Sequence, residues 1–188
     1  MRRNRDFIGP AGMGGMVSLW GASSLIQSIQ YGTVSVSGTT SGTATITAVD
    51  TADSMLVFMG QSCTDTTSFF ERGNVGLSLT NSTTVTATKA GSNSNIVAGF
   101  CVVEFYPGVV KSVQRGSRAG FNATSTITEV NTGKVWVMHL GYVGVVGNTY
   151  FPEYDAVRCE LTNSTTLTMK NSNAGGATFF YWQVVEFF

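Results

Sequence analysis

Short stretches of alternating polar and apolar residues dominate this chain. Residues 43–49, Thr-Ala-Thr-Ile-Thr-Ala-Val, have a period of two, which is the pattern of a half-buried β-strand. No stretch of useful length has the apolar spacing that predicts an amphipathic helix. The pattern predicts twelve strands, at residues 26–36, 43–49, 55–60, 76–79, 83–89, 96–106, 111–121, 124–130, 135–142, 156–161, 165–170 and 177–188.

A sequence repeat divides these strands into two groups of six. Leu-Thr-Asn-Ser-Thr-Thr occurs at residues 79–84 and again at 161–166, and Val-Val-Glu-Phe follows at 102–105 and 184–187. Upstream, residues 44–51 match 125–132, and residues 26–32 match 110–116. The offset changes only between blocks, where loops tolerate insertions. We therefore predict an all-β protein with an internal duplication: an extended N-terminal arm at 1–23, then two tandem antiparallel β-sandwich modules at 24–107 and 108–188.

The repeated Asn-Ser pair has two interpretations. Asn81 and Asn163 each begin an Asn-Ser-Thr triplet, which fits the acceptor sequence for N-glycosylation. Asn-Ser also favours a tight turn, and strands are predicted on both sides of each copy. Because the N-terminus lacks the apolar segment of a secretory leader, the turn is favoured.

The last predicted strand of each module is apolar on both faces. Residues 100–106 read Phe-Cys-Val-Val-Glu-Phe-Tyr, and residues 180–188 read Phe-Tyr-Trp-Gln-Val-Val-Glu-Phe-Phe. A strand of this kind is expected to be covered on both sides. One cover is the core of its own module, and the other is the sister module or another subunit.

Composition limits the partners of the chain. Only 12% of its 188 residues are charged and the formal net charge is zero, whereas 43% are hydrophobic. A neutral chain creates no basic field for nucleic acid or anionic lipid, so neither a nucleic-acid nor a membrane partner is expected. No apolar run approaches the ~18 residues of a membrane-spanning helix.

Residues that could bind a metal or act as a catalytic base are scattered. His139 is the only histidine, and Cys63, Cys101 and Cys159 have no CxxC spacing, so we expect reduced, mostly buried thiols and no metal or cofactor. Neither a GxSxG elbow nor a P-loop is present. His139 is most simply a structural histidine of its strand.

Two glutamates occupy the same position of the repeat. Glu104 and Glu186 could be interpreted as the carboxylate pair of a glycoside hydrolase. A repeated, buried glutamate more often accepts hydrogen bonds from a repeated partner, and Gln30 and Gln114 are the candidates. We therefore expect a structural role for both carboxylates and no enzymatic activity.

The segments that do not repeat contain the remaining candidate sites. Two aromatic segments, 67–74 and 148–155, could stack on sugars or pack against a neighbouring subunit. The basic arm is expected to anchor the protein to a larger assembly. The candidate residues are Arg2, Arg3, Arg5 and Trp20 in the arm, Phe69, Phe70, Glu71 and Arg72 in the first segment, and Tyr150, Phe151, Glu153, Tyr154 and Asp155 in the second.

Four blocks of the repeat, at 26–32, 43–50, 79–88 and 102–105, carry a resemblance that covers residues 24–188 but not the arm. They resemble small β-rich virion proteins of tailed bacteriophages and prophages, which are assigned as tail-fibre, tail-tip or decoration proteins. The resemblance brings no catalytic residues.

The resemblance implies a non-enzymatic structural component of the virion, assembled in the bacterial cytoplasm and located at the tail, as part of a fibre, tip or adaptor. A capsid decoration (cement) protein and a carbohydrate-binding adhesion module are the alternatives. The implied partners are further copies of the chain, as a homo-oligomer and most simply a trimer, other virion proteins, and a glycan of the host surface.

Overall fold

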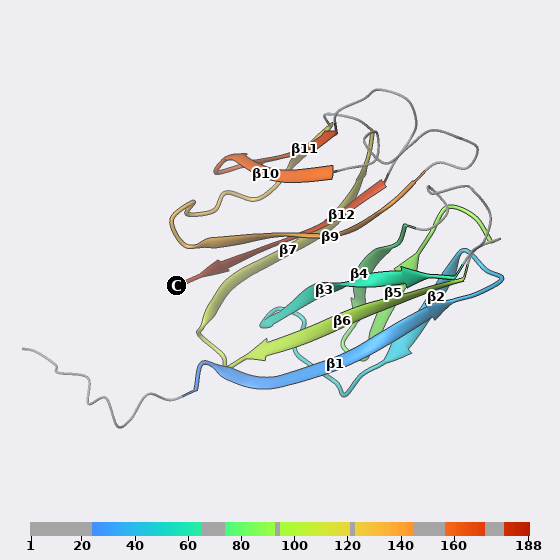
Figure 1. Ribbon diagram of the computed structural model, residues 1–188. Coiled ribbons are helices and arrows are strands. Elements are labelled where there is room, and N and C mark those ends of the chain that lie inside the picture. Colours follow the sequence, from blue (N-terminus) through green and yellow to red (C-terminus); the bar gives the residue numbers. More distant parts are fainter. Residues whose placement is uncertain (1–23, 65–73, 93–94, 121–122, 145–156, 172–178) are drawn as a thin grey trace, which may run out of the picture.

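The described part of the chain consists of β-strands joined by turns and loops (Figure 1). The computed structural model describes residues 24–64, 74–92, 95–120, 123–144, 157–171 and 179–188. The predicted all-β class is confirmed, and each predicted strand overlaps an observed one. No helix long and apolar enough to cross a membrane occurs among these residues. The strands are β1 (Ile26–Val36), β2 (Ser41–Thr45), β3 (Ser54–Cys63), β4 (Gly76–Asn81), β5 (Thr84–Thr88), β6 (Ile96–Phe105), β7 (Val110–Ala119), β8 (Ala123–Thr126), β9 (Val135–Val143), β10 (Val157–Asn163), β11 (Thr166–Asn171) and β12 (Phe179–Phe187).

The strands form three antiparallel sheets whose order is the same in the two halves of the chain. β1-β6-β3 and β7-β12-β9 correspond, as do β2-β5-β4 and β8-β11-β10. The β2-β5-β4 strands of the first half and the β9-β12-β7 strands of the second half join into one six-stranded sheet. Its order is β2-β5-β4-β9-β12-β7, and Gly76 of β4 pairs with Gly141 of β9 where the halves meet. In Figure 1 the β10 and β11 strands lie at the top, β9, β12 and β7 cross the middle, and β6 and β1 form the lower border.

Cross-strand pairs of glycine with an aromatic residue recur at matching positions. Gly32 of β1 lies opposite Phe100 of β6, and Gly116 of β7 lies opposite Trp182 of β12. A Cβ at Gly32 would be 2.5 Å from the Phe100 ring, and a Cβ at Gly116 would be 2.6 Å from the indole. Each ring therefore covers the bare backbone of its partner, which fixes the register of the pair.

The second and eighth strands end earlier than their alternating sequences predict. After β2 the chain leaves the ladder, and the backbone N–H of Ile46 and of Val49 donate to the carbonyls of Thr83 and Ser82 in the β4–β5 turn. After β8 the N–H of Ile127 and Val130 make the same bonds to Thr165 and Ser164. The segment after each of these strands thus bonds to a turn instead of a strand, and the alternation of polar and apolar residues cannot reveal this.

The hairpin predicted at both copies of the repeated hexapeptide is present. In each copy the asparagine side chain accepts the backbone N–H two residues later, with distances of 2.9 Å both from Thr83 to Asn81 and from Thr165 to Asn163. This is the turn-forming bond that asparagine favours. The hexapeptide is repeated because the turn holds the segment that follows β2 or β8.

The core is continuous between the two halves. One cluster of buried residues combines Leu56, Phe100 and Val102 of the first half with Leu140 and Val185 of the second. β12 is buried on both faces, as predicted: Val184 packs toward the β10-β11-β8 sheet and Val185 toward the first half. The sister half is therefore the second cover of this strand.

Candidate functional site

The candidate residues of the arm and of the two aromatic segments lie outside the described residues. These are Arg2, Arg3, Arg5, Trp20, Phe69, Phe70, Glu71, Arg72, Tyr150, Phe151, Glu153, Tyr154 and Asp155. Their assignment to anchoring, sugar binding or subunit contact stays a prediction. The site is therefore built from the strands.

The two repeated glutamates are buried hydrogen-bond acceptors. Glu104 Oε1 accepts the backbone N–H of Asp50 at 2.8 Å, and its Oε2 accepts the Ser28 hydroxyl at 3.0 Å. Glu186 repeats this pattern with Asn131 and Ser112, at 2.8 and 3.2 Å. Each carboxylate thus ties the last strand of its half to the loop before β3 or β9, which is a structural role.

The prediction that Gln30 and Gln114 donate hydrogen bonds to these glutamates is wrong. The Gln30 side chain instead bonds both backbone groups of Thr47, accepting its N–H at 2.7 Å and donating to its carbonyl at 3.0 Å. Gln114 makes the same two bonds with Thr128. A side-chain amide has both a donor and an acceptor, as a backbone peptide group does. It can therefore make the hydrogen bonds of a neighbouring strand at the points where β2 and β8 have ended.

Replacing Glu186 with glutamine is expected to lower the free energy of unfolding by about 1–3 kcal/mol at pH 7, because a carboxylate accepts stronger bonds than an amide. The Asn131 N–H and the Lys111 ammonium, 2.9 Å away, hold the pKa of Glu186 below its ordinary value. The stabilisation is therefore full above ~4.3, the pKa of unfolded glutamate, and is lost as the pH falls through the lower folded pKa.

Urea denaturation at pH 7 and at pH 3 checks this expectation. Glu129→Gln is the matched control, because this exposed carboxylate has only a 3.5 Å contact with Ser164. A loss for Glu186→Gln that is as large at pH 3 as at pH 7 would contradict the assignment.

An arginine and a glutamine of the second half close the free edge of β3 in the first half. Gln183 of β12 is fully buried and bonds both backbone groups of Leu56, its Oε1 accepting the N–H at 3.2 Å. Arg115 of β7 donates to Gln183 Oε1 at 2.8 Å and to the carbonyls of Thr51 and Ser54. These bonds satisfy strand-edge groups that would otherwise lie unpaired in the interior.

The acceptors of Arg115 are neutral oxygens. Burial lowers the pKa of its guanidinium to about 10, so the group stays protonated at neutral pH. Its role is to donate in several directions at once, which suits the planar, multiply donating guanidinium.

A pocket of about 210 Å³ lies beside Arg115 between the two halves. Its large apolar lining residues are Leu77, Leu79, Leu140, Tyr181 and Trp182, and Arg115 is its one charged lining residue. This volume is below the ~300 Å³ at which pockets for drug-sized ligands begin. The bonds that Arg115 makes to Gln183, Thr51 and Ser54 leave it poorly placed to receive a ligand.

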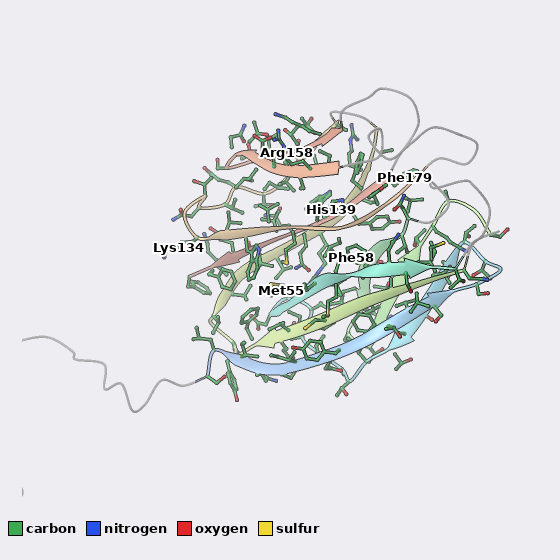
Figure 2. The ribbon with its side chains drawn as sticks, viewed as in Figure 1. Met55, Phe58, Lys134, His139, Arg158 and Phe179 are labelled. Atoms are coloured by element: carbon green, nitrogen blue, oxygen red, sulfur yellow. The ribbon has the colours of Figure 1, made fainter. Side chains whose placement is uncertain are left out.

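His139 lies half-buried on β9, between Arg158 of β10 and Phe58 of β3 in the view of Figure 2. It pairs across the ladder with Trp182. Burial lowers the pKa of the imidazole, so it is neutral at pH 7. Nε2 of His139 and Nε1 of Trp182 are buried without a hydrogen-bond partner among the described residues. The Tyr142 ring lies near the imidazole, with 6.2 Å between the ring centroids, and nothing in the His139–Trp182 pair indicates catalysis.

The three cysteines are free thiols with different exposure. Cys101 is buried, Cys159 is half-buried, and Cys63, at the end of β3, is exposed, so the expectation of mostly buried thiols fails at Cys63. Burial raises the pKa of Cys101, and it raises that of Cys159 to about 11.

Cys63 is expected to react first with a thiol reagent such as DTNB at pH 8, because only an accessible thiolate attacks. One thiol per chain should be modified rapidly and two slowly in the native protein. A Cys63→Ser variant should lose the rapid phase, and a rapid phase that persists in this variant would contradict the assignment.

The side of the β1-β6-β3 sheet that points away from the β2-β5-β4 sheet, here called the outer face, is apolar and partly exposed. At one end of it Met55, Val103 and Phe105 are buried in the core shared with the second half, and the rest is open. Exposed fractions are 71% for Tyr31, 58% for Met59, 45% for Ile29 and 38% for Val97. Cys101 lies in the same face, opposite Tyr31 on β6. A solvent-facing side of an antiparallel sheet is normally polar, so this face differs from an ordinary surface.

Two other faces of the molecule show what the outer face lacks. The corresponding side of the β7-β12-β9 sheet contains Gln183, Val185 and Leu140, and there the first half buries it. On the β10-β11-β8 sheet, Glu160 pairs with Arg158 at 3.2 Å and with Lys170 at 3.1 Å on the exposed surface. The open part of the outer face thus combines the apolar composition of the buried side with the solvent exposure of the charged sheet.

No group of three or more metal-ligating side chains occurs in the described ranges of the chain. No family model, curated protein or solved structure that was compared with the chain matches it. The arrangement of its own residues is therefore the basis for a functional conclusion. Sequence reasoning missed the outer face, although the absence of charge in residues 26–36 and 54–63 is visible in the sequence.

Proposed function

We propose that this protein is a non-enzymatic structural component of a tailed-phage virion, located at the tail as part of a fibre, tip or adaptor and docked through its N-terminal arm. It acts as a homo-oligomer, with other virion proteins as further partners. The strands build the subunit, and the arm with Arg2, Arg3, Arg5 and Trp20 supplies the attachment to the particle.

The outer face is the observation that carries this proposal. Apolar side chains gathered on an exposed sheet surface are costly unless another protein covers them, and virion subunits work in permanent contact with neighbours. The interior contacts support the same function. Gln183 and Arg115 fasten the two halves to each other with bonds to backbone groups, which gives a rigid block instead of a hinged pair.

The titratable side chains of the described residues are poorly placed for catalysis. The two repeated carboxylates are occupied by backbone and hydroxyl donors, and the single histidine is neutral and half-buried. Both arrangements favour a structural protein over a hydrolase.

Mass spectrometry of purified phage particles tests the proposal, combined with immunogold labelling of the same particles. We expect the chain in stoichiometric amount and label at the tail. Label on the capsid would instead identify a decoration protein, and absence from particles together with glycan binding would identify an adhesion module. Either of these results would overturn the tail assignment.

A further inference from the structure

We propose that the outer face of the β1-β6-β3 sheet is the subunit interface, and that a second copy of this chain covers it. The inference deepens the proposed function, on which it rests for the expectation that the chain self-assembles. Three properties of the face support a second copy as its cover: its charge, its shape, and the way this chain covers the corresponding face of its own second half.

The sheet is almost free of charge. β1 and β3 contain no charged residue, and the single one of β6, Glu104, is turned inward to Ser28 and Asp50. β7, which corresponds to β1, carries Lys111, Arg115 and Arg118. Depletion of charge at the centre is what distinguishes subunit interfaces from other surface. An uncharged face offers nothing to an anionic lipid or to nucleic acid, whereas a copy of itself is an equally uncharged partner.

The face has an exposed aromatic ring and, near it, a position without a side chain. Tyr31 of β1 has 71% of its surface exposed, and its side chain hydrogen-bonds the Cys101 thiol of β6. Cys101 of β6 lies opposite Tyr31, and Gly99 is the next residue of β6 on the same face. At Gly99 the central strand therefore has no side chain on this face. A Cβ there would have no closer neighbour than Met59, at 3.5 Å, so the position is open. The ring of Tyr31 from one copy can seat on Gly99 of the next, either reciprocally in a dimer or cyclically in a trimer.

The second half of the chain shows how such a face is covered. In β12 the residue that corresponds to Gly99 is Tyr181, and its ring lies against the bare backbone of Gly76 in the first half, where a Cβ would be 2.0 Å from the ring. An aromatic ring on a strand glycine is thus already the contact between the two halves. The outer face presents the same two elements, Tyr31 and Gly99, with nothing of the described chain upon them.

The area is sufficient for a specific but modest contact. Tyr31, Met59, Ile29 and Val97, together with the polar residues beside them, expose on the order of 500 Å² of side chain, so two copies would bury about 1,000 Å², near the lower limit for specific interfaces. Dissociation in the micromolar range is therefore expected for the isolated protein.

Sedimentation velocity of the full chain between about 1 and 100 μM tests the inference, since a small interface dissociates in this range. We expect a concentration-dependent dimer or trimer. Tyr31→Ala removes the exposed ring and Gly99→Gln fills the open position, and each should raise the dissociation constant at least tenfold. Thr43→Ala, an exposed position on β2, should leave it unchanged. Circular dichroism of each variant verifies that it is folded.

A wild-type chain that stays monomeric throughout the range overturns the inference, as does an oligomer that both variants leave intact. If Tyr31→Ala fails to fold, Gly99→Gln and Met59→Lys decide, because a Cβ at Gly99 would make only ordinary contacts and Met59 is mostly exposed. These results are separate from the particle experiment. A chain that is monomeric but present in phage tails would contradict the proposed interface and support the proposed function. An oligomer that is absent from particles would support the interface and contradict the function.

Discussion

Gly141→Ala is expected to lower the free energy of unfolding by about 3 kcal/mol or more, with two causes that add. Gly141 has a φ of 90°, which an L-residue with a side chain adopts only with strain. A Cβ at this position would also lie 2.2 Å from the carbonyl oxygen of Val75. Because the obstacle is backbone, it cannot turn aside as a side chain could. The contact of β4 with β9, which joins the two halves of the six-stranded sheet, should open.

Gly60 is the matched control for this variant. It occupies the corresponding bulge of β3 with a φ of 97°, but a Cβ there would meet nothing within 4 Å. Gly60→Ala therefore carries the conformational strain alone, about 1–2 kcal/mol. Urea denaturation of both variants measures the difference. Equal losses would show that the close approach of Val75 has no energetic weight.

Arg115→Ala is expected to lower the free energy of unfolding by about 2–4 kcal/mol. The substitution removes three donors and leaves the carbonyls of Thr51 and Ser54 unpaired at the junction of the halves. It also removes the bond that orients Gln183 toward the edge of β3. A buried acceptor that loses its donor has given up its hydrogen bonds to water and gains none in return. The loss of stability should therefore exceed that caused by removing an exposed hydrogen bond.

Arg118→Ala, on the same strand and exposed, should change stability by less than about 0.5 kcal/mol. Arg115→Lys should recover only part of the loss, because one ammonium cannot reach acceptors in three directions. The measurement is urea denaturation of the three variants at pH 7. A full recovery by lysine would mean that charge, and not the planar geometry, holds the junction.

The strands could be predicted because their signal is local. Alternation along residues such as 43–49, and turn residues such as Asn81 and Asn163, act within a few positions of the chain. The repeat added long-range information, since equal spacing of Glu104 and Glu186 indicated equal places in two halves. The roles of Gln30 and Gln114 could not be predicted, because their bonds to Thr47 and Thr128 depend on where neighbouring strands end.

Within the candidate site, the sequence indicated which residues were special but not what they contact. It singled out Glu104 and Glu186 by their repetition, and the structure gave each of them backbone donors. It gave no sign that Arg115 or Gln183 would cross to the other half, because their partners are carbonyls and amides present in every residue. Positions such as Gly99 became informative only when the side chains around them were placed.

The sequence by itself determined the all-β class, the approximate positions of the strands and the correspondence between the two halves, because alternation, turns and repeats are properties of neighbouring residues. The tertiary structure decided which side of each sheet is covered. The β7-β12-β9 sheet and the β1-β6-β3 sheet have related sequences, yet Arg115 of β7 bonds to backbone carbonyls of the first half, whereas Tyr31, at the corresponding position of β1, is exposed. Burial depends on what the rest of the chain places over a strand: the two halves bury Phe105 and Val185 against each other, whereas the described residues leave the ring of Tyr31 uncovered.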